Sequence, residues 1–107
     1  MAIKVSLTSE AETDLFDIWR FVAENDSSIK ANSLLGKLES ICENLGKTPN
    51  KGHVPKELRR IDVFNFYEIH HKPYRILYER EETQILIHAI LDGRRDMESL
   101  LRARLLR

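Results

Sequence analysis

Apolar residues in the first half of the chain recur mainly at helical spacing. Residues 3–7 alternate between apolar and polar side chains and therefore predict a short strand. Ser9 and Glu12 have the spacing of a capping box, which predicts that a helix begins there. That helix has one apolar face, formed by Ala11, Leu15, Ile18 and Val22.

A second helix is expected after the polar residues 25–28, which interrupt the first pattern and can cap a helix. Its apolar stripe is long and is stopped by Gly46 and Pro49. The stripe consists of Ala31, Leu34, Leu35, Leu38, Ile41, Cys42 and Leu45. Two adjacent helices with a four-residue break predict an antiparallel αα-hairpin.

The second half of the chain is rich in residues that favour β-structure. Short strands are predicted at residues 58–63, 66–71, 74–80 and 84–91, and the first of these is the weakest. Residues 85–91 are apolar on both faces, which is typical of a strand in the middle of a sheet. A last helix is predicted over residues 96–106.

These elements follow in the order β-α-α-β-β-β-β-α, which indicates an α+β fold in one domain over residues 1–107. We expect an antiparallel sheet packed on the αα-hairpin, followed by a short C-terminal helix. Both long helices should lie on the same face of the sheet. The residues expected to meet there are Ile76, Tyr78, Ile85 and Ile87 with Leu15, Ile18, Leu34, Leu38 and Ile41.

Composition narrows the class of protein. The single cysteine, Cys42, excludes an internal disulfide and a thiolate metal site, and we expect it to be a packing residue. No apolar run approaches the ~20 residues that span a bilayer, and the N-terminus lacks a secretory signal. We therefore expect a cytoplasmic protein that does not associate with membranes.

The formal net charge is zero, but the charges are unevenly distributed. Residues 1–50 hold 5 basic and 8 acidic side chains, whereas residues 51–107 hold 12 and 9. The last fourteen residues carry five arginines against Asp96 and Glu98. An anionic partner should therefore meet the C-terminal half, although the total charge is not that of a dedicated nucleic-acid binder.

Three arginines lie where secondary structure should hold them rigidly. Arg75 is set among aromatic and aliphatic residues of a predicted strand, and Arg94 and Arg95 follow the end of the next one. Arginines held in this way can bind planar anions such as phosphate or carboxylate. Arg75 could instead pair with Glu68 or Glu79, and Arg94 and Arg95 with the acidic residues around them.

The chain resembles the RelE/ParE superfamily of bacterial toxins. The resemblance rests on the order of elements, the 74–78 strand (Tyr-Arg-Ile-Leu-Tyr) and the 93–96 exit (Gly-Arg-Arg-Asp). Residues 45–49 with Gly52, and residues 67–69, support it. It implies the toxin of a type II toxin–antitoxin pair, which forms a hetero-oligomer with a cognate antitoxin protein. We expect no cofactor.

The superfamily contains two activities. RelE-like members cleave mRNA in the ribosome without a metal, and Arg75, Arg95 and His70 would be the catalytic residues of that alternative. Two positions disfavour it, because Glu68 replaces a lysine of the groove and Leu101 falls near the place of a catalytic tyrosine. ParE-like members instead bind DNA gyrase and perform no chemistry, and this is the function we favour.

The gyrase interpretation places target binding in the cationic tail. Its candidate residues are Arg94, Arg95, Arg102, Arg104 and Arg107. Replacing Arg75 and His70 with alanine should then leave a folded, toxic protein, and deleting residues 96–107 should abolish toxicity.

The helical half should bind the antitoxin. Trp19 is either half-buried core or part of this surface, together with Leu15 and Val22. The histidines suggest no metal site, since neither His70 nor His71 has a second ligand at metal spacing. His53 lies in a loop and should have little functional role, and His88 should be a hydrogen-bonded core histidine.

Overall fold

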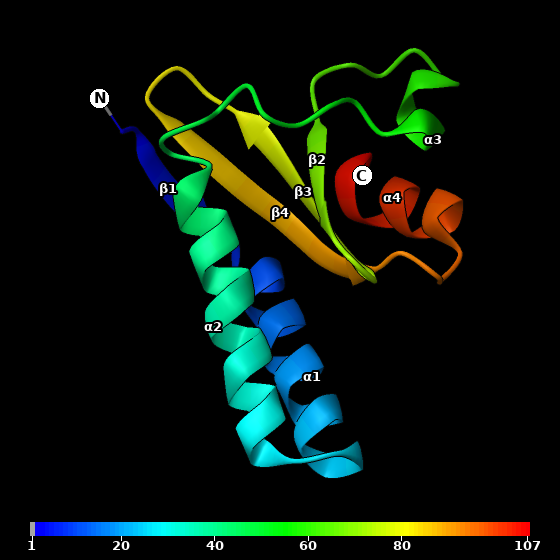
Figure 1. The fold of residues 1–107 in the computed structure, drawn as a ribbon. Coiled ribbons are helices and arrows are strands. Elements are labelled where there is room, and N and C mark those ends of the chain that lie inside the picture. The colour runs from blue at the N-terminus through cyan, green and yellow to red at the C-terminus, as the bar shows by residue number, and fades with distance from the viewer. Residues whose placement is uncertain (1) are drawn as a thin grey trace.

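The computed structural model describes residues 2–107. The elements are β1 (Lys4–Leu7), α1 (Ser9–Asn25), α2 (Ser28–Asn44), α3 (Lys56–Arg59), β2 (Tyr67–His71), β3 (Tyr74–Arg80), β4 (Gln84–Asp92) and α4 (Met97–Leu105) (Figure 1). The predicted α+β class is confirmed, with a four-stranded sheet, a helical hairpin and a C-terminal helix. Within residues 2–107, no helix is both long and apolar enough to cross a bilayer.

The two long helices begin at side-chain caps. The Thr8 hydroxyl accepts a hydrogen bond from the Ala11 N–H at 3.1 Å, and the Ser27 hydroxyl accepts one from Lys30 at 3.1 Å. The predicted cap at Ser9 is therefore wrong by one residue. Thr8 takes this place because its own N–H is still bound to Ile87 at the end of the sheet, so its backbone remains extended.

The strand predicted at residues 58–63 is wrong. This segment begins with the single-turn helix α3 and continues in turns, and only His53 forms a bridge with the outer edge of β2. Pro55 precedes the helix with a φ of −58°, which prearranges the first turn. Leu58 is then buried, with Ile61 and Val63 packed around the same cluster. Tertiary packing thus overrides the weak strand propensity.

The sheet has the order β1-β4-β3-β2, so β4 lies inside it as predicted. The β2–β3 and β3–β4 pairs are antiparallel, whereas β1 runs parallel to β4. The expectation of a wholly antiparallel sheet is therefore wrong for this one pair. Two hairpins join β2, β3 and β4, so β4 runs in the same direction as β2. The direction of β2 depends in turn on the side of the sheet from which the long loop enters it. The apolar pattern contains no information about that side.

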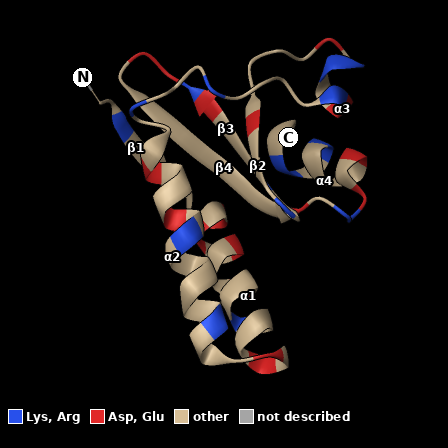
Figure 2. Cartoon of the chain, viewed as in Figure 1, with Lys and Arg blue, Asp and Glu red and all other residues tan. Residues whose placement is uncertain are grey.

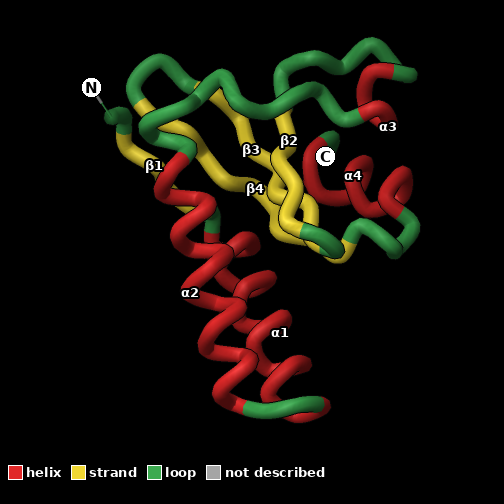
Figure 3. The backbone as a smooth tube through the Cα atoms, in the orientation of Figure 1, coloured by secondary structure: helices red, strands yellow, loops and turns green. Residues whose placement is uncertain are grey.

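Helices cover both faces of the sheet. Leu15 and Leu38 of the hairpin share a core with Ile76, Ile85 and Ile87, which confirms that α1 and α2 lie on one face. Figure 3 shows these helices side by side, with α3 and α4 across the sheet from them. Residues of α3 and α4 pack on the other face, where the cluster includes Leu58, Leu77, Ala89, Met97 and Leu101.

Candidate functional site

Arg75 lies on β3, on the sheet face that α3 and α4 cover, and it is held by two carboxylates. The two terminal nitrogens of its guanidinium donate to Glu57 at 3.0 and 2.8 Å, and its Nε donates to Glu68 at 2.5 Å. The Arg75 side chain is 12% exposed, and Glu68 is almost fully buried. The sequence offered an ion pair between Arg75 and Glu68 as the alternative to anion binding, and this pair is present. Glu57 is a second carboxylate partner of Arg75.

The charges of this cluster stabilise one another. Hydrogen bonds from Arg75 lower the pKa of Glu57 to about 2, and the same bonds raise the pKa of Arg75. Two carboxylates against one guanidinium leave Arg75 itself no free positive charge to attract a phosphate, although the exposed Lys56 and Arg59 line the same groove. Truncating Arg75 would leave both carboxylates without a counter-charge, so the expectation that Arg75→Ala folds normally is not supported.

The three residues of the nuclease alternative do not share one groove. His70 and Arg75 line a groove of about 310 Å³, together with His53, Lys56 and Glu68. Arg95 lines a different groove of about 270 Å³, between α1 and the ends of β3 and β4. His70 and Arg75 thus line one groove and Arg95 another, while Arg94 lines a further groove of about 350 Å³ together with His70 and Arg75.

The cations between β4 and α4 differ in their surroundings. Arg94 is 76% exposed and pairs with Asp92 at 2.6 Å, while its backbone N–H donates to the same carboxylate. Arg95 and Arg102 are exposed, and no ion pair to either side chain is found within residues 2–107. Figure 2 shows further basic positions on α3, which contacts α4. Arg95 and Arg102 are thus accessible cations, whereas Arg94, although exposed, is paired with Asp92.

The other two arginines of the tail bind the chain itself. Arg104 donates to Asp14 at 3.1 and 2.8 Å and to the His88 carbonyl oxygen at 3.0 Å. Arg107 pairs with Glu10. These contacts fasten α4 to α1. Because Met97 and Leu101 are also buried, deletion of residues 96–107 would remove part of the core and would not test target binding alone.

The predicted antitoxin-binding residues occupy different layers of the helical hairpin. Leu15 is 8% exposed and belongs to the core, whereas Trp19 and Val22 are half-buried. The Trp19 ring stacks on Phe16 with centroids 6.2 Å apart, and its N–H donates to Asn32 of α2 at 2.8 Å.

Two aromatic residues on this hairpin were missed. Phe16 is 56% and Phe21 is 65% exposed. Both lie outside the apolar stripe of α1, and this is the signal that could have identified them. Large apolar residues on a polar helix face favour a partner surface.

The histidines have partners that chain spacing did not reveal. His53 and His70 lie on either side of Glu68, with Nε2 atoms 3.2 and 3.3 Å from its two oxygens. His88 is 3.1 Å from Glu79, which confirms the predicted hydrogen bond, but its side chain is 22% exposed and so is not a core residue as predicted. Cys42 is 2% exposed and packs in the core, as predicted.

Comparison with known proteins agrees with this fold. Residues 5–97 match the family described as the ParE toxin of the type II toxin–antitoxin system parDE. Toxin ParE3 of Caulobacter vibrioides is 29% identical over 99 residues, covering 92% of this chain and 94% of the relative. The fold and the match define a bacterial toxin of the RelE/ParE superfamily. The chain belongs to the ParE toxin family of type II toxin–antitoxin systems.

Solved structures show the same fold at low sequence identity. The chromosomal ParDE system of P. aeruginosa contains a chain with a TM-score of 0.69 and 16% identity, covering 83% of this chain and 94% of that one. The RelBE2 toxin–antitoxin complex of Mycobacterium tuberculosis gives 0.63 and 14%, covering 86% and 92%. The scaffold is therefore common to ParE and RelE proteins, and it does not choose between their activities.

Proposed function

We propose that this toxin acts in the cytoplasm by binding DNA gyrase and performs no chemistry of its own. The observation that supports this most directly is the neutralisation of Arg75 by Glu57 and Glu68. A ribonuclease groove needs net positive charge at the phosphate. Here Arg75 is neutralised by its two carboxylates. Lys56 and Arg59 also line this groove but are exposed to solvent, and Arg95 lines another groove.

The proposed gyrase-binding surface consists of Arg94, Arg95 and Arg102. All three are exposed, and they lie on the approach to α4 or on α4 itself. The position of α4 is fixed, since Arg104 and the buried side chains of Met97 and Leu101 hold this helix against the rest of the domain. Exposed arginines on a rigid helix suit contact with an acidic protein surface.

The cognate antitoxin is proposed to cover the aromatic side of α1. Phe16, Trp19 and Phe21 offer an apolar surface of the kind that partner segments bury. Beside it, Phe21 also lines the groove that runs along Tyr74, Ile90 and Arg95. An antitoxin segment in this groove would hide both the aromatic surface and part of the cationic one.

The test is a pair of assays on the purified full chain. Supercoiling of relaxed plasmid by gyrase should be inhibited, and mRNA on translating ribosomes should remain intact. The double variant Arg95→Glu/Arg102→Glu should lose inhibition, because its two charges become repulsive at the contact. Arg20→Glu, an exposed arginine on α1, serves as the matched control and should retain inhibition.

The ribonuclease alternative predicts the opposite results. Codon-specific cleavage that disappears in His70→Ala would contradict the proposal and favour a RelE-like nuclease. His70 suits this purpose because its side chain is 47% exposed, so that its removal leaves the core intact.

A further inference from the structure

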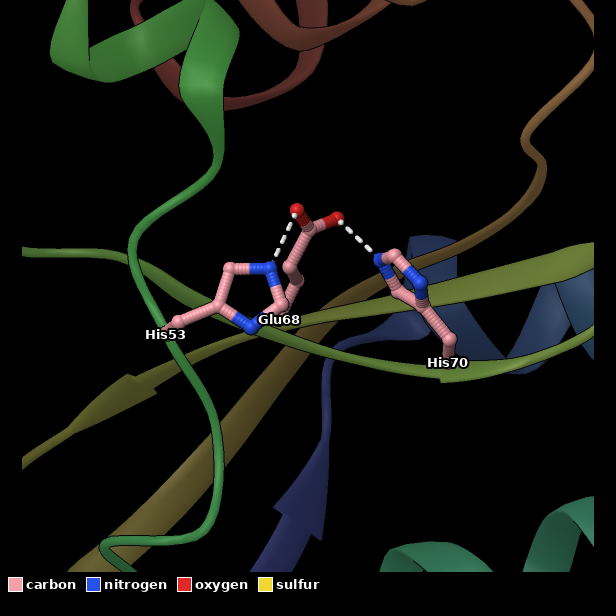
Figure 4. A group of neighbouring side chains, drawn as sticks. All are labelled: His53, Glu68 and His70. Atoms are coloured by element: carbon pink, nitrogen blue, oxygen red, sulfur yellow. Dashed lines mark ion pairs between the residues drawn. The ribbon is translucent and has the colours of Figure 1, made fainter.

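Two histidines and a glutamate converge outside the proposed gyrase surface, on the side of the sheet where β2 forms the edge. Figure 4 shows the imidazoles of His53 and His70 on either side of the Glu68 carboxylate. Each Nε2 faces a different oxygen, at 3.2 Å for His53 and 3.3 Å for His70. One nitrogen from each histidine and one oxygen of Glu68 all lie within 4.8 Å of one another.

The backbone fixes this arrangement. His53 and Glu68 are opposite residues of an antiparallel bridge, in which their amides exchange hydrogen bonds at 3.1 and 2.8 Å. Opposite residues of such a bridge project to the same face of the sheet. His70 follows Glu68 by two residues on β2, so it shares that face too. Strand geometry thus places Glu68 and His70, and the backbone bridge places His53 of the neighbouring loop.

Their spacing fits a small tetrahedral metal ion. Zinc bonds of about 2.1 Å to nitrogen and oxygen place neighbouring ligand atoms roughly 3.4 Å apart. The His53 and His70 nitrogens lie 3.2 and 3.3 Å from different oxygens of Glu68, within a few tenths of an ångström of this value, and one donor atom from each residue lies within 4.8 Å of the others. Coordination around one carboxylate oxygen therefore needs a small movement of the exposed imidazoles. Two imidazoles and one carboxylate are also the donor set of zinc-like ions, whereas magnesium and calcium prefer oxygen alone.

We propose that His53, Glu68 and His70 form a binding site for Zn²⁺ or a similar first-row divalent cation. Each histidine binds through Nε2 and Glu68 through a carboxylate oxygen. The fourth position faces solvent, because the histidine side chains are 58% and 47% exposed. Three protein ligands with one open position are a common zinc arrangement.

The local charges are compatible with a cation. Arg75 bonds one oxygen of Glu68, but its charge is also shared with Glu57, so the pair of carboxylates retains an excess negative charge. The second oxygen of Glu68 faces only His53 among the ion pairs within residues 2–107. Lys56 and Arg59 line the same groove and oppose the metal, but both are exposed and therefore screened by solvent.

Metal binding would join the loop before α3 to the edge strand β2. His53 belongs to that loop, which the bridge to Glu68 and the hydrogen bond from Gly52 to Tyr78 already fasten to the sheet. An ion bound only by the folded chain stabilises it by mass action. The thermal midpoint of the toxin should therefore rise with zinc concentration.

The experiment is a titration of the untagged full chain with Co²⁺ and Zn²⁺. Binding of Co²⁺ should give the visible absorption of a four-coordinate ion at one equivalent per chain, and Zn²⁺ should displace it. His53→Ala and His70→Ala should each weaken binding by more than the ~10–100-fold cost of losing an outer-shell partner. Both variants should also lose the rise in thermal midpoint.

His71→Ala provides the matched control, since it neighbours His70 on β2 but projects to the other face. It should bind Co²⁺ as the parent does. The proposal is overturned if the parent binds no more tightly than the double variant His53→Ala/His70→Ala. It is equally overturned if His71→Ala weakens binding as much as His70→Ala. Circular dichroism of the variants separates loss of metal from loss of fold.

Discussion

Arg104 of α4 is bound in a two-point ion pair to Asp14 of α1, with N–O distances of 3.1 and 2.8 Å. The pair sits where β1 has ended and β4 continues, paired with β3 on one side and with no strand of residues 2–107 on the side of β1. Asp14 accepts the Ile90 N–H at 2.9 Å, and Arg104 donates to the His88 carbonyl oxygen at 3.0 Å. Two side chains thus satisfy backbone groups that a neighbouring strand would otherwise bind.

This relationship predicts a large difference between two arginines of the tail. Arg104→Ala should lower the free energy of unfolding by roughly 1.5–3 kcal/mol, because charged hydrogen bonds are lost at a partly buried site. Arg107→Ala is the control, since that side chain is 59% exposed and should change stability by less than about 0.5 kcal/mol. Urea denaturation measures both values. Equal effects would show that the Arg104–Asp14 pair has no special role.

Stability should fall in acid through Glu57. Its pKa is about 2 in the folded chain and 4.5 ordinarily, so the unfolded chain binds more protons between these values. The stabilising contribution is complete above pH 4.5 and is lost as the pH falls toward 2. Urea denaturation across this range should show a smaller loss for Glu57→Gln than for the parent. Glu98→Gln, exposed on α4, should follow the parent, and an unchanged slope for Glu57→Gln would contradict the assignment.

Two glycines should respond to alanine in opposite directions. A Cβ at Gly52 would lie 2.7 Å from the Glu68 carbonyl oxygen and would collide with the Tyr78 hydroxyl, which accepts the Gly52 N–H at 3.1 Å. Gly52→Ala should therefore destabilise the fold by about 1–3 kcal/mol.

Gly36 is the counterpart on an open surface. It lies on α2, and a Cβ there would meet nothing within 4 Å. Gly36→Ala should stabilise the chain by about 0.5–1 kcal/mol, because alanine favours the helix. Thermal denaturation of the two variants beside the parent tests the pair. Thermal midpoints that shift in the same direction in both variants would contradict this account of the two glycines.

Cys42 should be unreactive in the folded chain. Burial, aided by the charges of Glu39 and Glu43, raises the pKa of its thiol to about 12. The thiolate is therefore scarce at neutral or mildly alkaline pH, and thiol reagents should react only when the chain unfolds locally or globally. Reaction with 5,5′-dithiobis(2-nitrobenzoate) should be slow in buffer and fast in urea. A fast reaction in buffer would show that this part of the core opens readily.

Exposed aromatics of α1 should matter for antitoxin binding. Phe16→Ser and Phe21→Ser should each weaken the complex at least ~10-fold if these rings are buried by the partner. Phe64→Ser is the matched control, because Phe64 is 53% exposed but lies in the loop before β2. Calorimetric titration with the product of the adjacent antitoxin frame gives the affinities. Equal effects at Phe64 and Phe21 would argue against a contact specific to α1.

The apolar pattern was sufficient for most of the fold. It predicted both long helices, the strands β1 to β4 and the interior position of β4, because these elements bury one or two continuous faces. It failed at residues 58–63, where three apolar side chains suit either a strand or a turn. It also could not give the direction of β1 relative to β4.

The contacts within the candidate sites were harder to predict from the sequence than the fold. Spacing along the chain gave Glu68 and Glu79 as alternative partners of Arg75, and of these two Glu68 is the one that binds it. It did not suggest Glu57, which arrives from α3, or the approach of His53 to His70. Each of these contacts joins segments that the long loop brings together.

The sequence by itself determined the α+β class, the helical hairpin and the family, since these follow from local periodicity and short motifs. Tertiary structure alone decided which charges are free. Arg75 and Arg104 look like Arg95 and Arg102 in the sequence, yet the first two are bound to carboxylates and the second two face solvent. A side chain's charge is local, but its counter-charge comes from wherever the fold places a carboxylate within hydrogen-bonding distance.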